Sequence, residues 1–154
     1  YPKPKRSKAT FKDIKESSVP STKYYLSTRY LETLKNHKAR HESKGNGFGF
    51  EIIEDNQIAN AIVVGGMGRE RNLVRDNRIV DFNPVTKIKG GVNREFIRRM
   101  TPPEWSRLQG FPDSFRIVVS DASAYKQFGN SVAVPAIKAT AEEIIKVLRT
   151  AEAI

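Results

Sequence analysis

Two glycine-rich segments combine residue types that can bind a large polyanion. Residues 44–48 (KGNGF) place a lysine and an asparagine among glycines, and residues 65–71 (GGMGRER) carry two arginines at their end. Glycine lets the backbone approach a partner closely, and asparagine and arginine side chains can bond to phosphates or base edges. The predicted contact residues are Lys44, Gly45, Asn46, Gly47 and Phe48 in the first segment, and Gly65, Gly66, Arg69 and Arg71 in the second.

Each segment also has a plainer interpretation. Asn46-Gly47 is a common signal for a hairpin turn between two strands. In the second segment, Arg69 or Arg71 could pair with Glu70 or contact phosphate only. The basic residues around the first segment favour the binding interpretation there, and the two interpretations stay balanced for the second.

The net charge indicates the class of partner. The chain has 27 Lys and Arg against 17 Asp and Glu, which gives a formal net charge of +10 at pH 7. Such a surface attracts nucleic acids, although a merely solubilising surface is the alternative. The net charge is +8 over residues 1–50, +2 over residues 51–100 and zero over residues 101–154. A nucleic-acid face should therefore lie in the first two-thirds, and the last third should have another role.

Candidate nucleophiles and metal ligands are few. The sequence contains no cysteine, which excludes disulfides, thiolate–metal sites and a thiolate nucleophile. His37 and His41 have a spacing that can hold zinc on a helix, but no suitably spaced third ligand accompanies them. We therefore predict no metal site and interpret the histidine pair as facing solvent or phosphate.

Hydrophobic spacing predicts a mixed structure around the two segments. Residues 27–41 have the pattern of a helix that Ser27 caps. Runs of β-branched residues predict strands, and Asp76-Asn77 predicts a turn. The expected strands span residues 50–54, 58–64, 72–74 and 78–82.

The last third has a helical pattern. Thr101 and Glu104 have the spacing of a capping box, and Arg107 stands one turn after Glu104, where an internal ion pair could form. Asp121 could cap a short helix that runs through Phe128 and closes at Gly129. Apolar residues then recur at helical spacing, so we predict a final amphipathic helix that begins near Asn130-Ser131.

Two stretches of this last third resemble a known family. Residues 98–112 (RRMTPPEWSRLQGFP) and 124–135 (AYKQFGNSVAVP) are similar to the ninth and tenth motifs of the DNA cytosine-5 methyltransferases, in that family's order. The basic arm and glycine-rich segments before them look like that family's target-recognition domain. One departure is Ala61-Ile62, where the family usually has a threonine before an aliphatic residue.

The resemblance implies an α+β fold. A small twisted β recognition domain with glycine-rich loops would be followed by helices that complete a Rossmann-like methyltransferase core supplied by another chain. Residues 1–21 would form an extended arm from the catalytic core, and residues 22–93 the target-recognition domain. Residues 94–154 would hold the ninth-motif helix, the tenth motif and a C-terminal helix that docks on the catalytic domain.

The resemblance also implies what this chain lacks. In the family, a thiolate from a Pro-Cys dipeptide attacks C6 of a flipped cytosine, and C5 takes a methyl group from S-adenosylmethionine. This sequence has neither the cysteine nor the main glycine-rich cofactor motif. We therefore expect no catalytic residue and no methyl transfer by this chain alone. It resembles the smaller subunit of a split restriction–modification methyltransferase, or a carboxyl-terminal piece of one.

The expected partners are double-stranded DNA and a catalytic methyltransferase chain or domain. An alternative is a freestanding sequence-specific DNA-binding or regulatory module derived from such an enzyme. An unrelated RNA-binding domain would need an aromatic stacking pattern that the sequence lacks.

In the family, the tenth motif lines the S-adenosylmethionine pocket, which implies cofactor contacts from Asn130, Ser131 and Val132. The pocket would be complete only with the catalytic core. The plainer interpretation is that Asn130 or Ser131 caps the final helix. The sequence shows no membrane-spanning apolar run and no secretory signal, so we expect a cytoplasmic protein of bacterial type that associates with the nucleoid.

Overall fold

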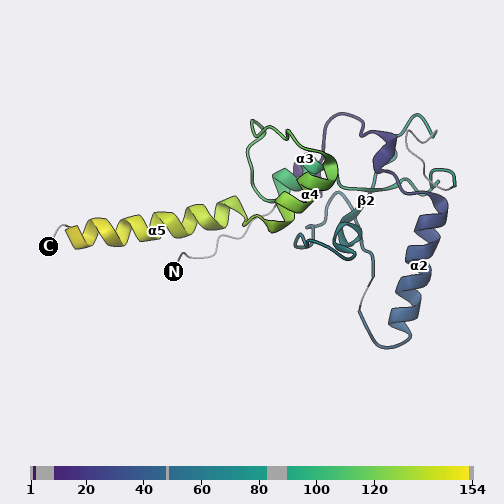
Figure 1. The fold of residues 1–154 in the computed structure, drawn as a ribbon, viewed down its shortest axis with the longest axis horizontal. Helices are drawn as coiled ribbons and strands as arrows, with labels where there is room; N and C mark the ends of the chain where they lie inside the picture. Colours follow the sequence, from purple (N-terminus) through teal and green to yellow (C-terminus); the bar gives the residue numbers. More distant parts are fainter. Residues whose placement is uncertain (1, 3–8, 48, 83–89, 153–154) are drawn as a thin grey trace.

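The computed structural model describes residue 2 and residues 9–47, 49–82 and 90–152 (Figure 1). The predicted contact residue Phe48 and most of the expected arm before residue 9 lie outside this part of the chain. The first elements are α1 (Phe11–Ile14), η1 (Thr22–Tyr24), α2 (Thr28–Glu42), β1 (Ile52–Ile53) and η2 (Gly68–Asn72). They are followed by β2 (Leu73–Arg75), β3 (Ile97–Arg99), α3 (Pro102–Leu108), α4 (Asp121–Asn130) and α5 (Val134–Glu152).

A small sheet in the order β1-β2-β3 lies between two helical layers. β1 runs parallel to β2, and β2 pairs antiparallel with β3 through Val74 and Arg98. Because side chains alternate between the faces of a strand, Leu73 packs in one cluster with Leu31 and Leu34 of α2, and Val74 packs in another with Trp105 of α3. The expected α+β class is confirmed, and β3 places the sheet across the expected boundary at residue 93.

Two of the expected strands are wrong. Residues 58–64 form no strand, because Asn72 replaces a strand partner: its side-chain oxygen accepts from the Asn60 amide at 2.8 Å, and its side-chain nitrogen donates to the Asn60 carbonyl at 3.0 Å. Residues 78–82 also form no strand. The turn lies at Asn77-Arg78, one residue later than expected, and Arg78 reaches back to the carboxylate of Asp76.

The capping signals were mostly accurate. The Ser27 hydroxyl accepts from the Tyr30 amide at 3.1 Å, and Thr101 and Glu104 form the expected capping box. The expected cap of α4 is wrong, because the Ser120 hydroxyl, and not Asp121, accepts from the Ser123 amide.

The last helix, α5, projects away from the rest of the molecule (Figure 1). It begins at Val134 rather than at Asn130-Ser131, because Ser131 ends α4 instead. Its apolar side chains are exposed, and Ile144 and Leu148 keep 54% and 56% of their surface open. In the part of the chain that the structure describes, every helix is too short or too polar to cross a membrane.

Candidate nucleic-acid interface

The first glycine-rich segment is a loop that continues directly from α2. The amides of Lys44 and Asn46 both donate to the His41 carbonyl, at 3.1 and 3.0 Å. Gly45 has a φ of 73°, the left-handed conformation that glycine adopts after a helix end. The hairpin interpretation of Asn46-Gly47 is therefore wrong, because a helix and not a strand precedes the turn. Lys44, Gly45, Asn46 and Gly47 are all exposed.

The second glycine-rich segment turns sharply before η2. Gly65 and Gly66 have φ values of 82° and 51°, and the Gly68 amide donates to the Gly65 carbonyl at 3.0 Å. A Cβ at position 68 would collide with the carbonyl oxygen of Val63, so only glycine allows this close approach. The segment is thus a shaped loop whose exposed tip is Gly65-Gly66.

The two segments meet around one hollow of about 530 Å³, called the loop hollow below. The structure thereby brings together residues that are about twenty positions apart in the sequence. One of its walls is α2, which contributes the histidine pair. Its lining includes Gly47 of the first segment and the nearby Gly49; Gly65, Gly66 and Arg71 of the second segment; and His37 and His41 of α2.

The two arginines of the second segment lie against different neighbours. Arg71 lines the loop hollow. The guanidinium of Arg69 lies 5.5 Å from the centre of the Tyr125 ring and lines a pocket of about 230 Å³ beside α4. The structure therefore does not bring these two predicted contact residues to the same pocket.

Glu70, between these arginines, has other partners. It is buried and accepts hydrogen bonds from the Tyr30 hydroxyl at 3.1 Å and from Arg99 at 3.0 Å. Burial and the Glu70 carboxylate together raise the pKa of Tyr30. The expected pairing of Arg69 or Arg71 with Glu70 is therefore wrong. Glu70 fastens the second segment to α2 and β3, a role that its sequence neighbours gave no sign of.

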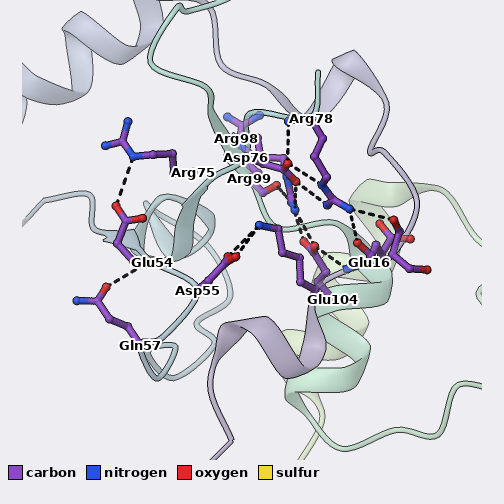
Figure 2. Close-up of polar contacts among 12 residues, drawn as sticks. Glu16, Glu54, Asp55, Gln57, Arg75, Asp76, Arg78, Arg98, Arg99 and Glu104 are labelled. Carbon is purple, nitrogen blue, oxygen red and sulfur yellow. Dashed lines mark hydrogen bonds and ion pairs between the residues drawn. The ribbon is translucent and has the colours of Figure 1, made fainter. Parts of the chain in front are cut away.

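A buried ion network holds this interface onto the helices (Figure 2). The Arg98 side chain is fully buried and donates to both oxygens of Glu104, at 2.7 and 2.8 Å, and to Asp76 at 2.9 Å. Paired bonds between guanidinium and carboxylate are among the stronger polar contacts in proteins. The expected pair of Glu104 with Arg107 is wrong, because Arg107 bonds to Asp113 at 2.7 Å.

The network continues through Arg78 to the N-terminal part of the chain (Figure 2). Arg78 donates to Asp76 at 2.7 Å and to the Glu16 carbonyl at 2.8 Å, and the Glu16 amide donates to Glu104 at 3.2 Å. Burial opposes ionisation of Asp76, but hydrogen bonds from Arg78 and Arg98 outweigh it and hold the pKa of that carboxyl well below its usual range. The roles of Asp76 and Arg78 were missed from the sequence, where Asp76 appeared only as part of a turn and Arg78 as the first residue of an expected strand.

The three predicted cofactor residues lie together at the end of α4. Asn130 and Val132 are exposed, while the Ser131 hydroxyl donates to the Phe128 carbonyl at 2.7 Å and accepts from Gln109 at 3.3 Å. The expectation that Asn130 or Ser131 starts the last helix is wrong, because Asn130 is the last residue of α4.

The chain is similar to known proteins over most of its length. The family described as C-5 cytosine-specific DNA methylase matches residues 1–146. The chain is similar to the type II methyltransferase M.HpaII of Haemophilus parainfluenzae, with 70% identity over 96% of this chain and 41% of that protein. It is 38% identical to the type II methyltransferase M.SsoII of Shigella sonnei over 96% of this chain and 35% of that protein. The fold is similar to that of the S. pombe Dnmt2 methyltransferase, with a TM-score of 0.64, 16% identity and coverage of 91% of this chain and 42% of that one. The chain spans about two-fifths of the length of these proteins.

Proposed function

Because the chain belongs to the C-5 cytosine-specific DNA methylase family, we propose that it is the DNA-recognition part of a DNA cytosine-5 methyltransferase of a restriction–modification system. It positions a specific duplex site for base flipping and methylation at C5. The observation that carries this proposal is the loop hollow, because two separate glycine-rich segments and Arg71 converge there on the basic part of the chain. Such a surface suits a polyanion that the backbone must approach closely.

The proposed DNA contacts come from both segments. Lys44 and Arg71 supply positive charge to phosphates, and Asn46 and Arg69 can also bond to base edges. A bidentate arginine contact to guanine would discriminate against other bases by about 1–3 kcal/mol. The full set comprises Lys44, Gly45, Asn46, Gly47, Phe48, Gly65, Gly66, Arg69 and Arg71.

The chemistry must come from outside these residues. The family uses S-adenosylmethionine, and its thiolate nucleophile has no counterpart here because the sequence contains no cysteine. We assign the nucleophile and the main cofactor site to a catalytic chain or domain that acts with this one in the cytoplasm, on the DNA of the nucleoid. Flipping the target base costs a few kcal/mol, roughly, and DNA contacts from this chain would offset that cost.

An apolar surface supports docking on such a catalytic part. Ile144 and Leu148 on α5 and Val118 in the loop before α4 are exposed, Val118 by 87%. The net charge of residues 101–154 is zero, so the long-range repulsion that acts between strongly charged surfaces is absent. Neighbouring exposed apolar side chains, such as Ile144 and Leu148 one turn apart on α5, commonly mark protein interaction sites.

The end of α4 lies in the same region, residues 101–154, and its residues could form one side of the cofactor pocket. The exposed Asn130 amide can donate to and accept from a bound cofactor, and the exposed Val132 side chain can contact its apolar parts. The Ser131 hydroxyl is occupied by Phe128 and Gln109, so Ser131 holds the shape of this turn. Without the catalytic part, these three residues alone should bind S-adenosylmethionine weakly or not at all.

The test is methyl transfer from labelled S-adenosylmethionine to DNA. The chain alone should transfer none, and mixing it with the catalytic part should restore transfer. Ile144→Lys combined with Leu148→Lys should abolish this restoration while leaving DNA binding intact, and Lys138→Glu, on the same helix, serves as the control. Methylation by the chain alone, or the absence of DNA binding, would overturn the proposal.

A further inference from the structure

A histidine pair on α2 faces the loop hollow. His37 and His41 lie one helical turn apart, with ring centres 4.4 Å from each other. Both line the hollow together with the two glycine segments. The Nδ1 atom of His37 is buried and has no hydrogen-bond partner among the described residues. A buried polar atom in this condition costs free energy, which a ligand that bonds to it would recover.

The charges around the pair are positive. Arg71 lines the same hollow. Burial, and then the neighbouring His37, lower the pKa of His41. The positive charges of Arg40 on α2 and Lys44 in the first segment both contribute to lowering the pKa of His41. Glu42 is the nearest acidic residue in sequence, and its carboxylate lies 4.0 Å from Lys38 on the same helix. None of the described residues that line the hollow is acidic.

We propose that His37, His41 and Arg71 form an anion site in the loop hollow that binds a phosphate group of the DNA backbone. The site rests on the proposed function, because it requires that this face meets DNA. A phosphate offers several acceptor oxygens, and a protonated imidazole donates from both ring nitrogens. The glycines that line the hollow have no side chains that would keep a phosphate away from the two imidazole rings on α2.

Proton uptake follows from this arrangement. An anion that contacts the rings from the hollow favours the charged form of His41 and raises its pKa, which burial, His37 and the cations Arg40 and Lys44 lower in the free protein. DNA binding should therefore take up protons. The added affinity is present below the pKa of the complex and is lost as the pH rises through it.

The sequence has only two histidines, so nuclear magnetic resonance can follow each imidazole ring directly. The pH titration would be recorded for the whole chain, free and with a duplex of randomised central sequence, both with and without EDTA. We expect DNA to raise the pKa of His41 by about one unit and to shift the ring signals of His37. DNA binding that leaves both rings unchanged would overturn the anion site alone, whereas the absence of DNA binding would overturn the proposed function as well. A response that EDTA abolishes would assign the pair to a metal and also overturn the site.

Variants separate phosphate contact from base contact. His37→Gln and His41→Gln keep polar side chains that cannot take up a proton, and Asn36→Gln on the same helix is the matched control. We expect each histidine variant to weaken DNA binding about fivefold at pH 6, with little change at pH 8, equally for the random duplex and for a duplex selected from that pool. A loss confined to the selected duplex would mean base contact and overturn the phosphate assignment. Helix content measured by circular dichroism would show that the variants fold.

Discussion

The basic part of the molecule, up to Asn93, and the part after it share an apolar core but differ in their polar contacts and in the faces that they expose. In the basic part, polar side chains replace missing strand bonds, such as Asn72 with Asn60 and Asn93 with the Leu26 and Ile97 carbonyls. The part after it is mostly helical, and its Trp105 packs in one core cluster with Phe11 and Val74 of the basic part. The first part exposes basic, glycine-rich loops, and the second exposes apolar side chains on α5. This contrast supports the proposed division between binding to DNA and docking on a protein.

The largest expected effect comes from breaking the joint between the two parts. Arg98→Met would leave Asp76 and Glu104 buried without their shared cation, so we expect it to lower the free energy of unfolding by about 3–5 kcal/mol. Urea denaturation measures this loss. Arg75→Met, which removes an exposed pair with Glu54, should cost less than about 1 kcal/mol. Equal losses in the two variants would mean that the buried network does not join the parts.

A tight contact between Val64, which precedes the second segment, and Gly129 of α4 offers a second way to test how the two parts of the molecule are joined. A Cβ at position 129 would overlap the Val64 side chain, so Gly129→Ala should displace the loop and cost about 1–3 kcal/mol of stability through overpacking. Adding Val64→Ala should recover most of that loss. Thermal unfolding of both single variants and the double variant gives the coupling energy, and purely additive effects would refute the contact.

The two arginines of the second segment should differ in their effect on DNA binding. Arg71→Ala removes a cation from the loop hollow and should weaken binding by about 1–2 kcal/mol, with a reduced dependence on salt. Arg69→Ala should weaken binding less, because the Arg69 side chain must leave the Tyr125 ring before it can reach DNA. Anisotropy titrations at two salt concentrations compare the variants, and identical salt slopes for wild type and Arg71→Ala would contradict the role of Arg71.

The smallest expected effect is on acid stability. The pKa of Asp76 is lowered in the folded chain, so its ion pairs stabilise the fold above the ordinary carboxyl pKa of 3.8 and are lost as the pH falls through the lower, folded-state value. Asp76→Asn should be less stable at neutral pH and should lose less further stability between pH 4 and pH 2. Melting temperatures across this range test the difference in slope, and parallel curves would exclude Asp76 as its source.

Local signals were predictable from the sequence, and long-range polar partners were not. Ser27 and Thr101 cap their helices as expected because a cap involves residues only three positions apart. The prediction of a strand over 58–64 was wrong because the apolar pattern of these residues gives no sign that Asn60 bonds to the side chain of Asn72, twelve positions later. The partner of Glu70 is Arg99 rather than an adjacent arginine, because burial and sheet pairing decide between cations that the sequence presents as equal. The sequence located the two glycine segments, but it could not predict that they line one hollow with His37 and His41 of α2, because that contact depends on the tertiary structure.

The exposed face of α5 also bears on how long the chain survives unassembled. The helix is held at its start, where the Val134 amide donates to the Gln109 carbonyl at 2.9 Å, and its exposed remainder projects from the body. Such a segment opens locally at little cost, and proteases cleave such openings readily. Docking would close that route, so surplus copies would be degraded faster than assembled ones. The side chains that we propose to dock on the catalytic part would then also keep the amounts of the two parts in proportion, without any separate regulator.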